Sequence, residues 1–360
     1  PHELRNAGEG PSTWSIPQHI TTVDAKTGQG VRNTYQIEGI IDTLLERFFE
    51  FGHLNSTVIF HDDVLSRYRA QAAARQQHGG AGSAHPDGPL PTFLIQAILA
   101  CAAVSASTPE PELQEWGKNV GWHLALQGLH QRLAGDGMAD LDLVQAIILI
   151  ASCWCGDHPN SQERISLFET AFRLAYDLNL TSSLDLDALS PEIRAKRIVI
   201  FWGLYSLDKT IALICRRPPL LNSDLHSVPK LSLSDVVLAR AKGSERLNLA
   251  LSTDDPGRIA ENDDIWTLRL LESFVTLSKI LETTSLPMIE RRAMQSLTFR
   301  AMQNQVSGVE GQLEEWCQNH GELLSTATGE GPVYQGIAEA LVALLHVAQL
   351  QLYSPALRYE

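Results

Sequence analysis

One stretch of the chain constrains the fold more than any other: RIVIFWGLYSLDKTIALICRRPP, residues 197 to 219. Because it is apolar on nearly every face, it predicts a helix that is buried on most sides. Asp208 and Lys209 lie in the middle of this helix, and two arginines and two prolines close the stretch. An ionised carboxylate in an apolar interior is strongly destabilising unless it is paired. The stretch therefore predicts a specific partner for Asp208.

The helix that carries Asp208 offers it no cationic partner on the same face. Its neighbours three and four positions away are uncharged, and Lys209 is expected to point about 100° away around the helix. Arg217 is the favoured partner, because the chain can turn back after the helix and a planar guanidinium matches a carboxylate. Arg216 and the start of another helix are alternatives. The remaining alternative is a narrow solvated stripe shared by Asp208 and Lys209.

Helical patterns recur from residue 35 onward. Between residues 37 and 48, isoleucine, leucine and phenylalanine follow three-and-four spacing. Capping residues indicate helix starts at Asp140, at Asn160 with Glu163, and at Ser190 with Pro191. Late helices are expected at about 264–284, 287–321 and 333–353. The predicted fold is all-α: one large single bundle of packed helix hairpins, with no significant sheet.

The same patterns divide the chain into a tail and one domain. Residues 1–34 are polar and aperiodic, which predicts a linker or tail. Residues 35–360 form the predicted domain, with flexible loops near 77–90 and 243–263. Pockets in helical bundles lie between helices, and the candidate pocket-lining residues are Trp154, Trp202 and Tyr205. A plain aromatic core is the alternative explanation of these three side chains.

Charge and cysteine content restrict the classes of partner. The formal net charge of −14 repels phosphate backbones, so the chain itself is not expected to bind nucleic acid tightly. The five cysteines are odd in number and lie in apolar helical contexts, which is typical of reduced core thiols in an intracellular protein. The longest uncharged run, residues 88–109, has an apolar part too short to cross a membrane, which needs about 20 residues.

No catalytic, cofactor-binding or metal-binding site is predicted. Class I terpene synthases are all-α and hold magnesium through two acidic motifs, and Asp62, Asp263 and Thr267 partly match them. However, Leu271 stands where the second motif needs a glutamate, and magnesium requires ligands that converge almost ideally. Cys153 and Cys155, two residues apart, would point to nearly opposite sides of a helix and could not form a zinc pair. A helical enzyme is the less favoured alternative.

The opening stretch resembles the most recognisable part of the fungal-specific transcription factor domain, also called the middle homology region. That family shows basic residues, Phe-Trp, an aromatic residue, Leu-Asp-Arg/Lys, Gly-Arg-Pro and an acidic loop ending at proline. The matching residues here are Arg197, Phe201, Trp202, Asp208, Lys209, Arg217, Pro218, Asp224 and Pro229. The usual glycine is Arg216, which resists the left-handed backbone that glycine permits. The similarity continues along most of the chain.

The resemblance implies the regulatory domain of a fungal RNA polymerase II transcription factor that controls a metabolic gene set. Such a domain is inducer-sensing, inhibitory or partner-binding. It implies DNA contact only through a zinc-containing module upstream of Pro1, with no cofactor in this chain itself. It further implies a small-molecule inducer, transcriptional co-regulators, a homodimer, no membrane, and a nuclear location with cytoplasmic retention. An all-α scaffold protein that uses the same domain outside transcription is the alternative.

Overall fold

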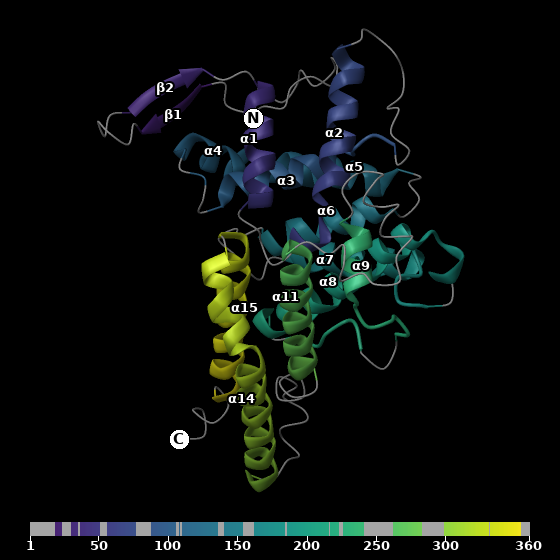
Figure 1. Ribbon diagram of the computed structural model, residues 1–360, viewed down its shortest axis with the longest axis vertical. Coiled ribbons are helices and arrows are strands. Elements are labelled where there is room, and N and C mark those ends of the chain that lie inside the picture. The colour runs from purple at the N-terminus through teal and green to yellow at the C-terminus, as the bar shows by residue number, and fades with distance from the viewer. Residues whose placement is uncertain are drawn as a thin grey trace.

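Helices make up the body of the protein in the computed structural model (Figure 1). The structure describes residues 19–23, 30–34, 37–50, 56–76, 88–105, 108, 110–135, 140–153, 162–183, 186–215, 217–222, 226–240, 262–282, 299–330 and 332–353. The predicted all-α class is confirmed for this body. Most of each expected loop, near 77–90 and 243–263, lies outside the described residues, and residues 262–263 belong to the helix Asn262–Ile280.

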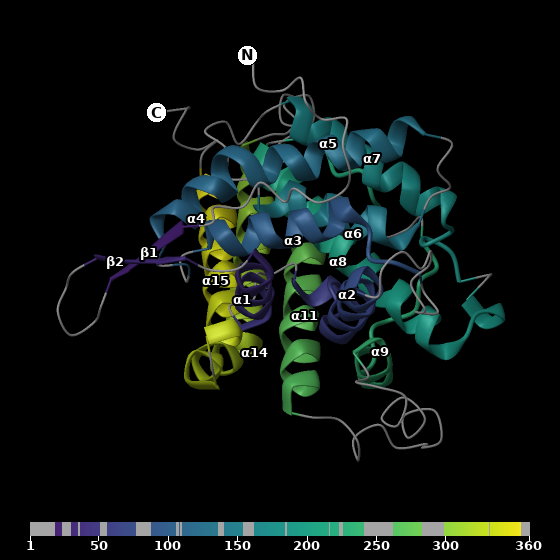
Figure 2. The same cartoon turned by 90° about the horizontal axis from the view of Figure 1, so that it is seen from above.

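The first helices gather at one end of the molecule. They are α1 (Ile37–Glu50), α2 (His61–Gln76), α3 (Thr92–Val104), α4 (Pro111–Trp116) and α5 (Trp122–Ala134), with short turns η2 (Ser56–Val58) and η3 (Gly117–Gly121). The apolar stripe predicted for α1 is buried over its described side chains. In the view from above, α3 lies between α1 and α5, and it contacts both (Figure 2). The apolar α3 is therefore covered on both sides.

The middle of the molecule is formed by α6 (Leu141–Cys153), α7 (Gln162–Asp177), η4 (Leu186–Ala188), α8 (Pro191–Cys215) and α9 (Leu233–Ala239). Two of the predicted caps are present. The Asp140 carboxylate accepts a hydrogen bond from the Leu143 N–H at 2.7 Å, and the Ser190 hydroxyl accepts one from the Ile193 N–H at 3.4 Å. The Asn160–Glu163 cap lies outside the described residues.

The late helices are α11 (Asn262–Ile280), α14 (Phe299–Glu330) and α15 (Pro332–Tyr353), at the other end of the molecule (Figure 1). They correspond to the three late helices expected from the sequence. α14 continues past the expected end at 321 because no proline interrupts it before Pro332. α14 and α15 pack against each other, and both also contact α11.

A short antiparallel hairpin lies in the segment expected to be an aperiodic tail. Strands β1 (His19–Val23) and β2 (Gly30–Thr34) pair with His19 opposite Thr34. The strands contain Ile20, Val31 and several threonines, and such β-branched residues favour an extended backbone. The sequence analysis missed this hairpin because each strand has only five residues, too few to show a clear alternation.

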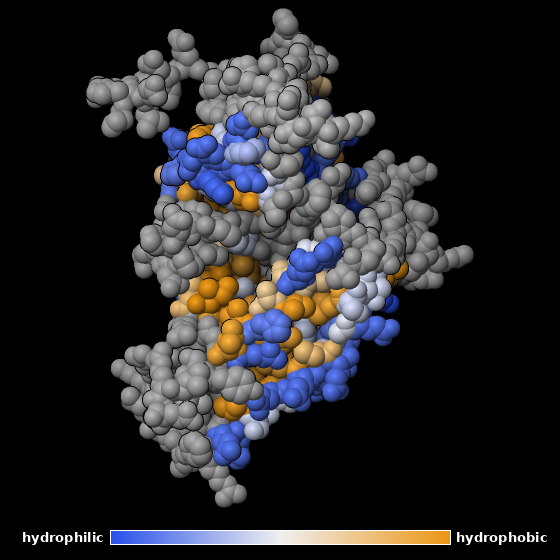
Figure 3. Space-filling view, turned by 90° about the vertical axis from the view of Figure 1, so that its left-hand side faces the viewer, coloured by the Kyte–Doolittle hydropathy of each residue, from blue (hydrophilic) through white to orange (hydrophobic). Residues whose placement is uncertain are grey.

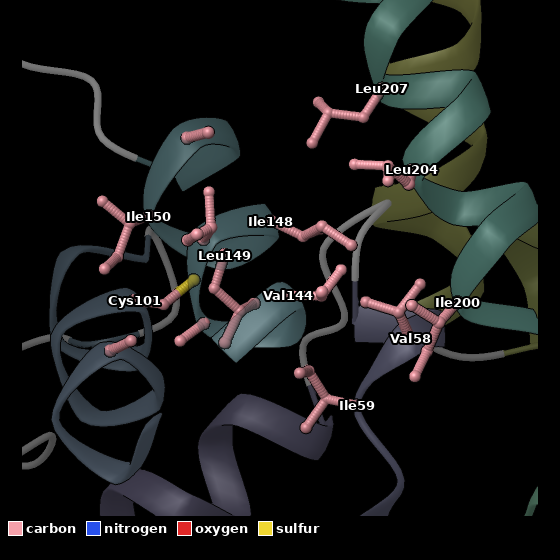
Figure 4. Packing of buried hydrophobic residues seen from close by; sticks show 14 of the residues in the cluster. Val58, Ile59, Cys101, Val144, Ile148, Leu149, Ile150, Ile200, Leu204 and Leu207 are labelled. Atoms are coloured by element: carbon pink, nitrogen blue, oxygen red, sulfur yellow. The ribbon is translucent and has the colours of Figure 1, made fainter. Parts of the chain in front are cut away.

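The core joins helices that are far apart in the sequence. Figure 4 shows Val58 and Ile59 from the η2 region, Cys101 from α3, four apolar residues of α6, and Ile200, Leu204 and Leu207 of α8 in one packed region. η2 approaches α8 so closely that a Cβ added at Gly203 would lie 2.2 Å from Val58 Cγ1. Any larger residue at this crossing would require the Val58 side chain to shift.

α8 is the core helix of the domain. By length and composition it is the one helix among the described residues that could cross a membrane, but 83% of its apolar window is buried inside the protein. The core helix of a globular protein passes the same test. Its burial against α6, α9 and α11 is what places the polar residues of α8 in the interior.

Candidate functional site

Asp208 and Lys209, the two charged residues in the middle of α8, are completely buried, with 0% of each side chain exposed. The Asp208 carboxylate accepts hydrogen bonds from two successive backbone N–H groups of the loop after α8. The Leu220 N–H lies 3.0 Å from each carboxylate oxygen, and the Leu221 N–H lies 2.9 Å from Oδ2. Asp208 therefore fixes the backbone of this loop onto the helix that precedes it.

Lys209 extends this contact to a third element. Its ammonium lies 3.2 Å from Asp208 Oδ2, donates to the Leu221 carbonyl, and pairs with Glu282 Oε1 at 3.5 Å. Glu282 follows α11 and also accepts a hydrogen bond from the Tyr205 hydroxyl. Lys209 thus connects α8 to the loop and to the end of α11. We call Tyr205, Asp208, Lys209 and Glu282 the α8 charge cluster.

The expected Asp208–Arg217 pair is wrong. The Arg217 guanidinium instead lies 3.8 Å from the Glu169 carboxylate of α7 and over the Phe168 ring, 5.8 Å from its centroid. The backbone does turn back after α8, since the Arg217 N–H donates to the Ala212 carbonyl at 3.0 Å. That turn directs N–H groups, rather than the guanidinium, at Asp208.

Two further expectations about this pair are corrected. Lys209 was expected to point away from Asp208, but its four-methylene side chain bends back to reach it. The solvated stripe is also wrong, because neither side chain is exposed. Arg216, the reserve partner, lies outside the described residues.

Of the remaining signature residues, Trp202 binds the same loop, whereas Arg197 binds the chain just after α7. The Trp202 indole N–H donates to the Pro229 carbonyl at 2.9 Å, and the Arg197 guanidinium donates to the Leu178 carbonyl at 2.8 Å. Pro218 lies at the exposed turn between α8 and the loop. Asp224 lies outside the described residues. The loop from 217 to 230 is therefore held to α8 at both ends, by Asp208 and Lys209 at one end and by Trp202 at the other.

His226 packs among the aromatic residues of α8. Its ring centroid lies 4.7 Å from that of Phe201, 5.4 Å from that of Trp202 and 5.8 Å from that of Tyr205. Both ring nitrogens are buried and have no hydrogen-bond partner in the part of the chain that the structure describes. Trp202 and Tyr205 are themselves buried, and Trp154 lies outside the described residues, so a pocket lined by these three remains a prediction.

Burial changes the ionisation of the groups around this site. It raises the pKa of Asp208, while Lys209 and the two backbone N–H groups act in the opposite direction. Burial also lowers the pKa of His226, helped by the positive charge of Lys279. The pKa of Lys279 is lowered by burial and then by the charge of Lys230. His226 is therefore neutral at pH 7.

Asp62, which partly matched the terpene synthase pattern, lies 2.7 Å from the neighbouring His61 ring, and the acids next to Asp62 and Asp263 are held by cations of the chain itself. Asp63 pairs with Arg67 at 3.2 Å and with Lys196 at 3.5 Å. Asp264 pairs with Arg240 at 3.5 Å. Within the described residues, no group of three His, Cys, Asp or Glu side chains could hold a metal ion, and Cys101, Cys215 and Cys317 form no disulfide.

The sequence analysis did not find Leu220, Leu221, His226 or Glu282. Leu220 and Leu221 act through backbone groups, which every residue except proline carries. Glu282 stands near the C-terminus of a helix, where a negative charge is normally unfavourable. That position is the only sequence signal that could have singled it out.

Fold and site together define an all-α domain whose interior polar groups hold its own loop. The family profile of the fungal specific transcription factor domain matches residues 45–318, well over half of the 360 residues. The chain therefore belongs to this family, which is a transcription factor domain and not a known enzyme family. No curated protein and no solved structure matches the chain significantly.

Proposed function

We propose that the chain is the regulatory domain of a fungal RNA polymerase II transcription factor, and that it controls a metabolic gene set by binding an effector or a co-regulator. The family match supports the general role. The observation that carries the finer proposal is the α8 charge cluster, which joins α8, the 217–230 loop and the end of α11 through buried ionic contacts. A ligand that shifts any of the three elements would shift the others.

Buried ionic groups suit such a role because they favour discrete arrangements. A partly separated buried ion pair is strongly unfavourable, so intermediate positions of the loop would be poorly populated. In this proposal, the effector selects between a closed loop and a released one. DNA contact and zinc belong to a separate module, consistent with the net charge of −14. The protein acts in the nucleus, with cytoplasmic retention as a further level of control.

The surface offers places for co-regulators or a second copy of the chain. On the face shown in Figure 3, apolar and polar residues lie side by side. The large exposed apolar side chains among the described residues are Tyr176, Ile193, Ile214, Leu220, Val342 and Leu350. Leu220 is notable because Asp208 holds its backbone.

A reporter assay tests the proposal. The chain is placed between a heterologous DNA-binding domain and an activation domain in yeast, and reporter output is compared with a fusion that lacks the chain. At equal protein level, we expect the chain to change output several-fold, and Asp208→Asn to reduce that change. The matched control is Asp187→Asn, an exposed aspartate outside the cluster. Identical output from all four fusions would contradict the regulatory role and favour a scaffold.

A further inference from the structure

The outward face of α15 is apolar where a surface helix normally carries charged residues. The inward face of α15 packs on α14, α11, α8 and α1 through apolar residues at three-and-four spacing. On the opposite face, Val342, Ala343, His346 and Leu350 are exposed. They lie within about 100° of one another around the helix, which has 3.6 residues per turn. We call these four residues the α15 face.

Leu350 shows how far this face departs from an ordinary protein surface. It is 72% exposed, the largest value among the large apolar residues in the described part of the chain, and Val342 is 36% exposed. Single exposed apolar residues are common, whereas apolar residues gathered on one face indicate an interaction surface. The side of the molecule on which α15 lies in Figure 1 faces the viewer in Figure 3, where apolar surface is open to solvent.

Formal charge is absent from the same part of α15. From Ala340 to Tyr353 the sequence has no Asp, Glu, Lys or Arg, although 19% of the whole chain is charged. The neighbouring α14, by contrast, exposes Glu314, Glu315 and Glu322. Two molecules that each carry −14 repel one another, and the repulsion is least where both surfaces are uncharged. The charge pattern therefore favours a second copy of this chain as the occupant of the α15 face.

The position of Glu339 decides how two copies of the helix would pair. Glu339 is exposed on the same side of α15, just before Val342. Parallel pairing would bring the two Glu339 carboxylates together. Antiparallel pairing centred on His346 would separate them by about 21 Å of helix, well beyond the screening length of about 8 Å at physiological salt. It would also set Val342 of each copy opposite Leu350 of the other, so that apolar side chains meet on both sides of His346.

We propose that the α15 faces of two chains pack antiparallel about a two-fold axis at His346, so that the chain forms a weak symmetric dimer. Such a pair is closed, because the same face of both copies is used and none is left to bind a third chain. The contact is short, about 12 Å from Val342 to Leu350, and small interfaces are weak and transient. The dimer deepens the proposed function, which allows for binding of a second copy, and it rests on that function for its biological meaning.

Sedimentation velocity of the purified chain, from about 1 µM to about 200 µM, tests this pairing in the range of weak affinities. We expect a reversible shift from monomer to dimer as the concentration rises. His346→Glu and His346→Lys should each weaken dimerisation at least about tenfold, because each places two like charges together at the axis. An equimolar mixture of the two variants should associate again, because glutamate then faces lysine.

The matched control is His130→Glu, which makes the same substitution at an exposed histidine of α5, at the other end of the molecule (Figure 1). It should dimerise as the wild type does. Because His346 is exposed, neither substitution there should alter the fold, and circular dichroism of each variant checks the helix content.

Three results would overturn the proposal. The first is a wild-type chain that stays monomeric over the whole concentration range. The second is a dimer that His346→Glu leaves intact, because association would then use another surface. The third is a mixture of the two variants that remains monomeric, because the two histidines would then not face each other. The measurement has no transcriptional readout, so it can fail while the reporter assay still shows regulation.

Discussion

Asp208 shows how a carboxylate is kept in an apolar interior. The backbone N–H groups of Leu220 and Leu221, together with Lys209, surround it with donors. Such donors are fixed in direction by the chain and lose little freedom when they bind the carboxylate. The buried charge is therefore stabilised by Lys209 and by the loop it holds, and its removal should release that loop.

Asp208→Ala should lower the free energy of unfolding by about 3–5 kcal/mol, because it leaves Lys209 without one of its two carboxylates and strands two buried N–H groups. Arg217→Ala should cost no more than about 1 kcal/mol, since Arg217 pairs loosely with the exposed Glu169. Urea unfolding measures both. In the double mutant the two losses should add to within about 0.5 kcal/mol. A larger coupling energy would mean that Asp208 and Arg217 interact after all.

His226 should make stability depend on pH. Because burial lowers its pKa in the folded protein below the ordinary value of 6.5, the unfolded chain binds more protons as the pH falls through 6.5. Stability from His226 is therefore present above about pH 6.5 and is lost on acidification. The loss of unfolding free energy between pH 7.5 and 5.5 should be smaller in His226→Gln than in the wild type. The exposed His346→Gln is the control, and parallel curves for wild type and His226→Gln would contradict the prediction.

Among the helices, α8 is held in place by close packing against its neighbours as well as by ionic contacts. Gly203 allows η2 to lie against it, and α9 and α11 cover other sides. α9 begins with a reciprocal cap between Ser232 and Asp235, which ends the 217–230 loop segment in a defined conformation. Contacts with α8 and the capped start of α9 therefore both restrict the conformation of the loop.

Gly203→Ala should lower the unfolding free energy by about 1–3 kcal/mol, because the new Cβ would overlap Val58 Cγ1 and force the η2 region away from α8. Gly311→Ala in α14 is the matched control. A Cβ there meets no atom within 4 Å, and alanine in an exposed helix should raise stability by about 0.5–1 kcal/mol. Denaturant unfolding of both variants measures these two changes in the free energy of unfolding. A stabilising effect at Gly203 would show that the contact is looser than described.

On the scale of the whole molecule, largely buried ion pairs connect the N-terminal helices to the middle of the fold. Arg67 of α2 binds Asp142 of α6 through both guanidinium nitrogens, at 2.9 and 2.7 Å. Lys196 of α8 reaches Asp63 of α2. A displacement of α8 would therefore disturb its contacts with the N-terminal helices as well as with α11. In the proposed regulatory role, these contacts are the route by which a change at α8 would reach other helices.

The chain by itself should not bind DNA specifically. With a formal net charge of −14, it lacks the positive field that supplies most of the affinity for phosphate backbones. Titration with duplex DNA at 150 mM salt should show no sequence-specific binding tighter than about 1 µM, and elemental measurement should find no stoichiometric zinc. Submicromolar, salt-resistant binding to one duplex would contradict the assignment of DNA contact to a separate module.

Most of the helices could be predicted from the sequence. The three-and-four spacing of apolar residues sets the helices, and local caps such as Asp140 and Ser190 set their starts, because both depend only on neighbours within one or two turns. The sequence also favoured burial of Asp208, since the helix around it is apolar on nearly all faces, although it left a solvated stripe as the alternative. The β1–β2 hairpin was not predicted, because strands this short show little periodicity in the sequence.

Which side chains and backbone groups from distant parts of the sequence lie in contact is visible only in the tertiary structure. Asp208 binds backbone N–H groups of Leu220 and Leu221, and no side-chain pattern marks which of many identical backbone donors a loop will present. Glu282 reaches Lys209 only because α11 packs against α8 with its end beside that lysine. Lys279 and His226 are brought to Trp202 in the same way. Helix crossing and loop path depend on packing of the whole core, so contacts between distant residues could not be read from local spacing.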